Sequence, residues 1–580
     1  MNNQHKLRVR VGQYSDKGRK LQNQDFHGLC VPDDPQLTSK GIAIAIADGI
    51  SSSKVSHVAA ESAVASFLAD YYCTSEAWSV KRSAERVISA ANSWLHSQTQ
   101  QSQYRFDKDR GYVCTLSVMV LRQNTAHLFH VGDSRIYKLH ERSLEQLTDD
   151  HRVWLGGDQS YLARAMGAHS QLEIDHRQVD MATGDVFVLA TDGVYEHVDA
   201  KLIHEAIASH PEDLDAAAKH VVEQAYAQGS EDNLTIQIVA VEAAPGAGDL
   251  GSRPPEAMLA MPPTLQPRMR FEGYTIVRQL HQTHRSQLFL ATDDETGVKV
   301  VIKVPSTEMK DKAAELEHLQ MEEWIARRVD NLHLLKPHTS GRERKHLFVA
   351  MEYIEGQTLE QWMTDHPAPS LEEVRSIIEQ TGKGLQALHR MEMIHQDIRP
   401  ANVMIDQSGT VKIIDYGTVR VAGLGQVAPE HAPVPGFVQY AAPEYFTGDG
   451  GSAASDLFSL AVMSYEMLSG RLPYGLDLAK TRTRGEQRKL TYRSVVDDNR
   501  PIPLWLDGVF RKALHIDPFR RHQEISEFTH ELRHPPEGLL HARRPPLAER
   551  HPVLLWKGIS LTLLLLVLLL LSTHPWVREL

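Results

Sequence analysis

Aspartates stand beside several short apolar runs, and this pattern constrains the fold more than any other feature of the chain. Runs of strand length that are rich in β-branched residues occur at 42–47, 113–121, 126–131, 186–190 and 234–241, and they predict β-strands. The aspartates at the ends of such runs, or in the loop before them, are Asp25, Asp48, Asp133, Asp192 and Asp232. One Asp-Gly after a strand is usually a turn. Several carboxylates at one sheet edge repel each other unless cations neutralise them, so the pattern predicts a Mg²⁺ or Mn²⁺ site with oxygen ligands.

A second group of motifs lies in the C-terminal half of the chain. Residues 395–402 read HQDIRPAN, and residues 415–417 read DYG after the short apolar run 411–414. Lys303 lies near the end of a predicted strand at 298–304, and a predicted helix at about 311–329 follows it. This combination is typical of a phosphoryl transferase that binds ATP with magnesium.

Composition changes along the chain predict where domains begin and end. Helical spacing at 55–72 and 80–97 alternates with the strands of the first half. We expect a first domain at 1–243, a Pro/Ala/Gly-rich linker at 244–270, a second domain at 271–534 and a Pro/Arg-rich linker at 535–552. A transmembrane helix at 553–577 and a short tail at 578–580 complete the predicted organisation.

The first domain resembles the metal-dependent protein phosphatases of the 2C type. The motifs that carry the resemblance are Ser15-Asp16-x-Gly18, Asn23-x-Asp25, Ala47-Asp48-Gly49, Gly132-Asp133-Ser134-Arg135, Thr191-Asp192-Gly193 and Glu231-Asp232-Asn233. The resemblance implies an α/β/β/α sandwich and hydrolysis of phosphoserine and phosphothreonine with two metals and no phosphoenzyme. It implies that Asp48 bridges two metals, that the Gly49 carbonyl contacts one, and that Asp192 and Asp232 complete the ligand shell of the second metal. Asp25 would act through water, and Asp133 would bind a third, weaker metal with Asp192.

Two residues depart from the phosphatase pattern. Lys20 stands where the family usually has an Arg that grips the substrate phosphate, and a lysine lacks the bidentate fork of a guanidinium. Gln24 stands where the family usually has Glu. Neither change removes a bridging ligand, so the resemblance still implies an active phosphatase with a weaker hold on substrate.

The second domain resembles the eukaryotic-type Ser/Thr protein kinases, with two lobes. The resemblance implies that Lys303 holds the ATP phosphates and pairs with Glu322, with Glu323 as the alternative, and that the backbones of Glu352 and Ile354 contact adenine. It also implies that Asp397 orients or deprotonates the attacking hydroxyl, that Asn402 and Asp415 bind magnesium, and that Arg399 lies near the transferred phosphate. Glu444 and Arg521 would form a structural ion pair.

Three departures from the kinase pattern bear on activity and regulation. The segment 280–288 contains no glycine where the family has a glycine-rich loop, which predicts weaker ATP binding unless Arg285 reaches a phosphate. An ordinary surface role for Arg285 is the alternative. Gln396 replaces the Arg that normally receives a phosphate on the activation loop, and Thr418 is the only Ser or Thr between Asp415 and Glu444. We therefore expect a kinase that phosphorylation of this loop does not switch.

Composition and the C-terminal run predict where the protein acts. The formal net charge of -12 argues against nucleic acid as the main partner. Gly558 to Ser572 is almost entirely Leu, Ile and Val, and Trp556 and Trp576 bracket the run. Basic residues concentrate before it, which predicts a single-pass anchor in membrane lipid with the catalytic domains in the cytoplasm, at a bacterial inner membrane. A buried or interfacial helix is the alternative.

These observations together predict an α+β multidomain protein that both adds and removes phosphate. Its partners would be ATP and proteins that carry Ser, Thr or their phosphorylated forms. Its cofactors would be two or three Mg²⁺ or Mn²⁺ ions in the phosphatase site, and Mg²⁺ with ATP in the kinase site. Two alternatives remain open: an active phosphatase with a pseudokinase that only binds nucleotide or a partner, and a tethered scaffold with neither activity.

Overall fold

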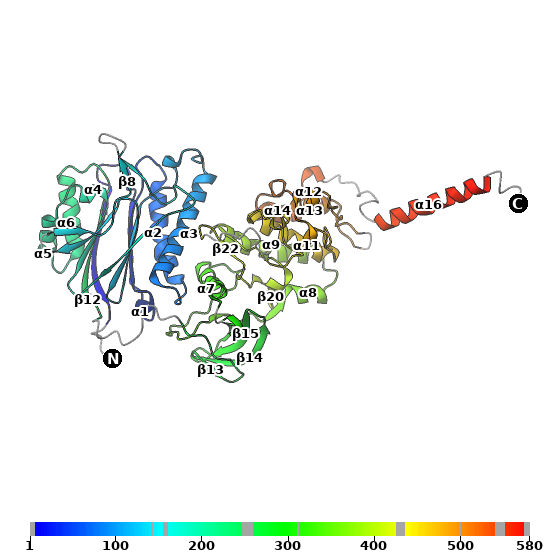
Figure 1. Cartoon of the computed structure of the whole chain (residues 1–580), viewed down its shortest axis with the longest axis horizontal. Helices are drawn as coiled ribbons and strands as arrows, with labels where there is room; N and C mark the ends of the chain where they lie inside the picture. Colours follow the sequence, from blue (N-terminus) through cyan, green and yellow to red (C-terminus); the bar gives the residue numbers. More distant parts are fainter. Residues whose placement is uncertain are drawn as a thin grey trace. The chain divides into compact units, whose positions relative to one another are not determined.

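The computed structural model describes residues 6–140, 143–154, 160–245, 259–309, 312–424, 436–497, 500–539 and 552–573. The chain divides into two compact units, which we describe separately (Figure 1). Unit 1 comprises Met1–Asp330, Lys336–Tyr353 and Val421–Gln426, and unit 2 comprises Asn331–Leu335, Ile354–Arg420 and Val427–Leu580. Unit 1 therefore holds the predicted phosphatase together with the β-rich part of the predicted kinase.

The N-terminal part of unit 1 is a sandwich of two five-stranded antiparallel sheets. One sheet has the order β1 (Arg8–Asp16), β12 (Leu234–Ala243), β11 (Val186–Ala190), β6 (Arg135–His140) and β7 (Ser143–Gln146). The other has the order β10 (Asp175–Asp180), β5 (Thr125–Val131), β4 (Leu116–Arg122), β3 (Ile42–Asp48) and β2 (Asp25–Cys30). A separate short hairpin joins β8 (Arg152–Trp154) to β9 (Ser160–Leu162).

Helices cover the outer face of each sheet, which gives the predicted α/β/β/α layering (Figure 1). Helix α2 (Ser56–Cys73) packs against β2 and β3, and its neighbour α3 (Val80–Gln101) packs against β5. Helix α6 (Leu214–Ala227) packs against β1 and β12 of the other sheet. The remaining helices of this part are α1 (Gln36–Lys40), α4 (Asp192–Tyr195) and α5 (Ala200–Ser209). The strands and helices predicted from periodicity are all present, with ends that differ by a few residues.

The sequence of β3 shows why the layers can pack so closely. The strand reads IAIAIAD, and its first six side chains are buried. Ile42, Ile44 and Ile46 lie in the core between the sheets. The alternation of side chains along a strand puts the intervening alanines on the opposite face, where α2 packs on β3. Small alanine side chains let the helix approach, so β3 is buried on both faces.

The rest of unit 1 is an antiparallel sheet with one long helix. The sheet runs β13 (Arg270–Phe271), β14 (Tyr274–Gln282), β15 (Ser286–Asp293), β16 (Lys299–Pro305) and β17 (Val349–Glu352), and the helix is α7 (Ala313–Arg328). The core of the sheet contains Tyr274, Phe289, Ile302 and Phe348. This is the arrangement expected of the smaller lobe of a kinase. Residues 246–258 of the predicted linker lie outside the described residues.

Unit 2 is mainly helical. Its helices are α8 (Leu359–Asp365), α9 (Leu371–His389), α10 (Pro443–Phe446), α11 (Ala453–Ser469), α12 (Arg484–Gln487), α13 (Trp505–Ala513), α14 (Ile525–Arg533) and α16 (Pro552–Thr573). A small sheet joins β18 (Gly356–Thr358), β20 (Val403–Asp406) and β21 (Val411–Ile413). A capping box between Ser370 and Glu373 begins α9, and Gly470 in the left-handed conformation ends α11.

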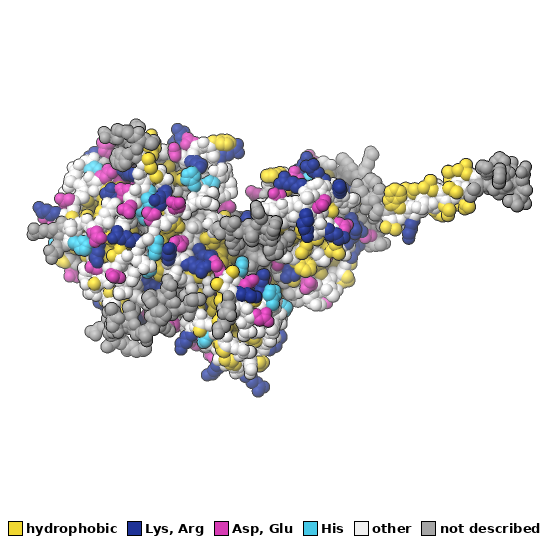
Figure 2. All heavy atoms as spheres, viewed as in Figure 1, with side chains coloured by type: hydrophobic (Ala, Val, Ile, Leu, Met, Phe, Trp, Pro, Cys, Tyr) yellow, Lys and Arg dark blue, Asp and Glu magenta, His cyan; other side chains and the backbone are white. Residues whose placement is uncertain are grey.

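The C-terminal helix α16 presents apolar side chains along its length (Figure 2). The residues Leu563–Leu570 are 50–64% exposed. Among the residues that the structure describes, however, none of the helices combines the length and hydropathy of a membrane span. The predicted transmembrane helix at 553–577 is therefore not supported. The helix runs from Pro552 to Thr573.

Candidate active sites

Two of the predicted metal ligands lie directly opposite each other in the sandwich. Asp25 begins β2, Asp48 ends β3, and the antiparallel register pairs them. Oδ2 of Asp25 accepts a hydrogen bond from Oγ1 of Thr191 at 2.9 Å. Oδ1 of Asp25 is buried and has no hydrogen-bond partner within the described part of the chain. A buried carboxylate oxygen without a donor is costly unless a cation or a proton reaches it.

The pKa values of these carboxylates show that they act on one another. Burial raises the pKa of Asp48 well above its ordinary value, and the charges of Asp25, Asp192, Asp133 and Asp232 raise it further. Burial, followed by repulsion from Asp133 and Asp232, raises the pKa of Asp192 to about 7. Burial raises the pKa of Asp25 to about 6. The carboxylates therefore resist being ionised together, and a bound cation would favour their charged forms.

Glycines bring the backbone close to this cluster. A Cβ atom at Gly49 would lie 2.8 Å from the backbone of Ser56, and one at Gly193 would lie 2.0 Å from the carbonyl oxygen of Asn233. Neither position therefore has room for a side chain. Asn233 also donates to the carbonyl oxygens of Lys17 and Gln22, at 2.9 and 3.0 Å. These bonds hold the 17–22 loop beside Asp232.

Two side-chain cations border the acidic cluster. Nζ of Lys20 lies 3.1 Å from Oδ2 of Asp232 and donates to Oγ of Ser51 at 3.2 Å. At the other side, Arg152 binds Oδ2 of Asp133 through Nε at 2.6 Å and Oδ2 of Asp192 through Nη2 at 3.0 Å. Sequence reasoning missed Arg152. It begins the short strand β8 and lies far from both aspartates in the chain, so neither spacing nor periodicity links it to them.

The donor set has the chemistry of a divalent-cation site, and one expected metal position already contains a positive charge. Asp25, Asp48, Asp192 and Asp232 supply the oxygen-only chemistry that Mg²⁺ and Mn²⁺ prefer, and the unpartnered oxygen of Asp25 supports that fit. Within the described ranges, no group of three or more His, Cys, Asp or Glu residues already has metal-binding geometry. At the expected third position, between Asp133 and Asp192, the guanidinium of Arg152 already supplies a positive charge.

The smaller kinase lobe contains the predicted lysine–glutamate pair. Nζ of Lys303 on β16 lies 2.5 Å from Oε2 of Glu322 on α7. Glu323, the alternative partner, is 2% exposed and pairs with Arg327 and Arg344. The pair therefore involves Glu322, in the geometry that holds the ATP phosphates in active kinases.

Two other predicted ATP contacts in this lobe are already engaged. The backbone N–H of Glu352 donates to the carbonyl oxygen of Lys336 at 3.0 Å, so this N–H is already used within the protein. Arg285 is 60% exposed in its side chain and pairs with Glu315 at 3.3 Å. That contact fits the surface role for Arg285 and does not require a phosphate.

The segment in place of the glycine-rich loop is a tight hairpin turn between β14 and β15. The backbone N–H of Thr283 donates to the carbonyl oxygen of Ser286 at 2.9 Å. The Thr283 hydroxyl in turn accepts from the backbone N–H groups of Arg285 and Ser286, at 3.2 and 3.0 Å. A threonine that caps its own turn satisfies these amides without glycine, and the same bonds keep the amides from a phosphate.

In unit 2, the predicted catalytic aspartate has partners on both carboxylate oxygens. Asn402 donates to Oδ2 of Asp397 at 2.8 Å, and Nε of Arg399 lies 3.3 Å from the same oxygen. The backbone N–H of Phe437 donates to Oδ1 at 2.8 Å, and the Phe437 ring lies 5.3 Å from the guanidinium of Arg399. Three predicted residues therefore meet, together with Phe437, which sequence reasoning did not identify.

The backbone of this catalytic loop is held by a buried carboxylate. Asp456 on α11 accepts from the N–H groups of His395 and Gln396, each at 2.8 Å. Gln396 has a φ of 69°, which is unfavourable for a residue with a side chain, so these bonds hold a strained turn.

Oδ1 of Asp415 accepts from the N–H of Gly417 at 3.1 Å. Ile354 begins the unit 2 segment after β17 and is 8% exposed.

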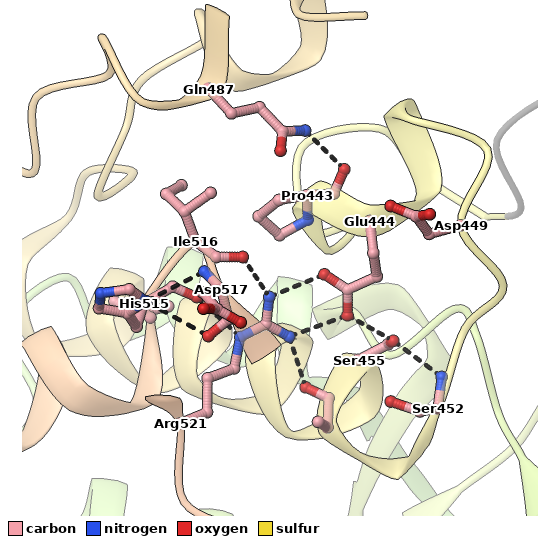
Figure 3. Close-up of polar contacts among 12 residues, drawn as sticks. Pro443, Glu444, Asp449, Ser452, Ser455, Gln487, His515, Ile516, Asp517 and Arg521 are labelled. Atoms are coloured by element: carbon pink, nitrogen blue, oxygen red, sulfur yellow. Dashed lines mark hydrogen bonds and ion pairs between the residues drawn. The ribbon is translucent and has the colours of Figure 1, made fainter. Parts of the chain in front are cut away.

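Glu444 and Arg521 form the predicted structural ion pair (Figure 3). Nη1 and Nη2 of Arg521 donate to the two carboxylate oxygens of Glu444 at 2.9 and 2.7 Å. Ser455 donates to Oε1 of Glu444 at 2.6 Å, and Arg521 also donates to the carbonyl oxygens of His515, Ile516 and Ala454. Buried charges with this many partners stabilise the packing of α10 against α11.

Comparison with known protein families identifies both halves. Residues 274–535 match the family described as Protein kinase domain, and residues 13–235 match the family described as Protein phosphatase 2C. The serine/threonine-protein kinase PknA of Mycobacterium tuberculosis is 27% identical over 288 residues, which cover 48% of this chain and 64% of that protein. The serine/threonine-protein kinase PrkC of Bacillus subtilis is 25% identical over 45% of this chain and 40% of its own length. The chain therefore spans less than two thirds of these relatives.

A solved structure titled "PppA, a key regulatory component of T6SS in Pseudomonas aeruginosa" is 22% identical over 40% of this chain and 97% of its own, with a TM-score of 0.33. The two family matches together decide the assignment. The chain is a fusion of a protein phosphatase 2C-type domain with a Ser/Thr-type protein kinase domain.

Proposed function

We propose that this protein is a bifunctional signalling enzyme that transfers phosphate from ATP to protein Ser and Thr and hydrolyses phosphoserine and phosphothreonine. The observation that carries the proposal is that, in each half, the charged groups that the reaction needs lie close to one another. In the kinase these are Lys303 with Glu322, and Asp397 with Asn402. In the phosphatase it is the mutually repelling cluster around Asp48.

In the phosphatase half, bound divalent cations would activate water and stabilise charge on the phosphoryl oxygens. Asp48, Asp25, Asp192 and Asp232 would hold them, with the Gly49 carbonyl as a neutral ligand. Lys20 would attract the substrate phosphate as a point charge from its place beside Asp232.

In the kinase half, the Lys303 ammonium would orient the ATP phosphates while Glu322 holds the lysine in place. Asp397 would accept the proton of the attacking Ser or Thr hydroxyl. The new P–O bond forms as the bond to the ADP oxygen breaks, and Arg399 would stabilise charge on the transferred group. Asn402 and Asp415 would hold the magnesium that accompanies ATP.

The test uses variants that each disable one half of the full chain. In Asp48→Asn, phosphate from labelled ATP should accumulate on a basic protein substrate, and in Asp48→Asn with Asp415→Ala it should not. Release of phosphate from a phosphothreonine peptide with Mn²⁺ should persist in Asp415→Ala and vanish in Asp48→Asn. Absence of transfer in Asp48→Asn would overturn the kinase half, and absence of peptide hydrolysis by the wild-type chain would overturn the phosphatase half.

Two observations favour a phosphatase with a pseudokinase as the second candidate. Oδ1 of Asp397 already accepts from Phe437, and the turn at Thr283 keeps its amides to itself. A protein with such a pseudokinase domain would bind ATP without transferring phosphate. ATP affinity measured in the absence of turnover separates it from a chain that binds no nucleotide.

We also propose that α16 attaches the protein to an apolar surface such as membrane lipid, at the cytoplasmic face of a bacterial inner membrane. The exposed leucines of Leu563–Leu570 carry this proposal. Deletion of residues 552–580 should move the protein from the membrane to the soluble fraction of lysed cells. An unchanged distribution would overturn it.

A further inference from the structure

Helix α7 carries two different sets of contacts on two faces. Glu322 points to Lys303 on β16. Glu317, Gln320, Trp324 and Arg328 recur at intervals of three and four residues, so they share one other face of the helix. That second face meets the phosphatase part of unit 1, where α7 packs against α2.

The centre of this contact is a pair of tryptophans. Trp324 is fully buried and Trp78 is 4% exposed, and their ring centroids lie 5.8 Å apart at an angle of 63°. Nε1 of Trp78 donates to Oε1 of Gln320 at 2.6 Å. Edge-to-face aromatic pairs contribute beyond the apolar area that they bury, so this is a packed interface.

Ion pairs surround the tryptophans. Glu317 binds Arg82 at 2.6 Å and also binds Arg86. Arg328 binds Asp70 of α2 at 2.6 Å, and both of these side chains are at most 12% exposed. Desolvated charge pairs fix orientation more strongly than exposed ones. We call Asp70, Trp78, Arg82 and Arg86 the docking face.

The segment that follows the DYG motif touches α3, the phosphatase helix that also carries Arg82 and Arg86. Gly423 has a φ of 81°, and a Cβ atom there would lie 2.5 Å from the carbonyl oxygen of Ser89 and 2.2 Å from Oγ of Ser93. Both serines belong to α3. Residues 421–426 belong to unit 1, so a kinase segment far from α7 in the sequence also lies against α3.

We propose that the docking face of the phosphatase domain is the positioning partner of α7, and that it keeps Glu322 within reach of Lys303. A helix held on its outer face by a tryptophan and three arginine-carboxylate contacts cannot rotate or swing away without exposing Trp324 and separating buried charges. The phosphatase domain thereby supports the kinase through its surface, independently of its own hydrolytic site. The proposal rests on the kinase activity proposed above.

The test reverses charge at the contact in full-length protein with the Asp48→Asn background. In Glu317→Arg, three cations face one another, and kcat for peptide phosphorylation should fall about tenfold or more, as for a typical coupling free energy. Hydrogen exchange in α7 should rise. Adding Arg82→Glu and Arg86→Glu should restore both. In chains with an intact Asp48, Glu317→Arg should leave phosphatase activity unchanged.

The matched control is Glu85→Arg, on the same helix α3, where Glu85 pairs with Lys81 at 3.8 Å. It should leave kcat unchanged. A wild-type kcat in Glu317→Arg, or a loss that the two added reversals do not repair, would overturn the proposal. If the wild-type chain transfers no phosphate, the affinity for ATP with Mg²⁺ decides instead. That affinity should weaken in Glu317→Arg and recover in the triple variant, and equal affinities would overturn the proposal.

Discussion

Nε of Arg152 lies 2.6 Å from Oδ2 of Asp133, and the same guanidinium reaches Asp192 at 3.0 Å. A positive charge of the protein itself thus lies between two carboxylates that would otherwise attract a cation. The guanidinium partly neutralises Asp133 and Asp192, which weakens their attraction for a third metal ion. The cluster around Asp48 is then the place where cations would bind.

The first prediction concerns the number of metal ions. Arg152→Ala removes the resident charge, so titration calorimetry with Mn²⁺ should find one more weak site per chain than in the wild type. Arg164→Ala is the control, because Arg164 pairs with Asp175 at 2.7 Å and touches no residue of the cluster in the described contacts. An unchanged number of bound ions would contradict the role assigned to Arg152.

The second prediction concerns acid stability of the sandwich. Burial lowers the pKa of His130 to about 4, and its ring contacts Ser117 Oγ at 2.9 Å and the Asp149 carbonyl at 3.1 Å. The folded-state pKa lies below the ordinary 6.5. The full stability is therefore present above pH 6.5 and is lost as the pH falls toward 4, by up to roughly 3 kcal/mol.

Hydrogen exchange of the β5 amides at a series of pH values, corrected for intrinsic rates, measures this loss. His130→Gln should flatten the dependence between pH 6.5 and 4, although it lowers stability at neutral pH. His140→Gln, at an exposed position, should keep the wild-type slope. If His130→Gln shows the same slope as the wild type, another group controls acid stability.

The third prediction concerns regulation of the kinase. Oγ1 of Thr418 donates to the carbonyl oxygen of His395 at 2.9 Å, so its hydroxyl serves the catalytic loop. No other Ser or Thr lies between Asp415 and Glu444. After Asp48→Asn protein is incubated with ATP, mass spectrometry should find no phosphate on Thr418. A stoichiometric phosphate on Thr418 that raises kinase activity would disprove the prediction that phosphorylation of this loop does not switch the kinase.

The fourth prediction concerns the buried ion pair of unit 2. Arg521→Met leaves Glu444 as an uncompensated buried charge and should destabilise unit 2 by about 3–5 kcal/mol. Arg521→Lys should destabilise it less, because it keeps the charge but loses the bidentate geometry. Calorimetry should show a lower unfolding temperature. Arg520→Met, at a side chain that is 73% exposed, should leave that temperature unchanged, and an equal effect of the two methionine variants would refute the assignment.

Local sequence was sufficient to predict the strands and helices with the clearest hydrophobic periodicity, and other elements of both domains were not predicted. The alternation in β3 and the helical spacing of α2 and α3 follow from which side chains must be buried. Lys303, Asp397 and Asn402 could be assigned because their neighbours along the chain form recognisable motifs. The apolar run at the C-terminus illustrates a limit, since hydropathy predicted a span, and the described part of α16 does not support one.

Contacts between distant segments were decided by tertiary structure alone. Glu322 and Glu323 are adjacent and chemically equivalent in sequence, and only the rotation of α7 selects Glu322 for Lys303 and gives Glu323 to Arg327 and Arg344. The contacts of Arg152 and of the docking face could likewise not be predicted, because they join residues that are distant in sequence and follow no periodic spacing. The sequence thus dictated the elements and the chemical groups, through burial patterns that repeat every two or 3.6 residues, whereas their pairing required the packed fold.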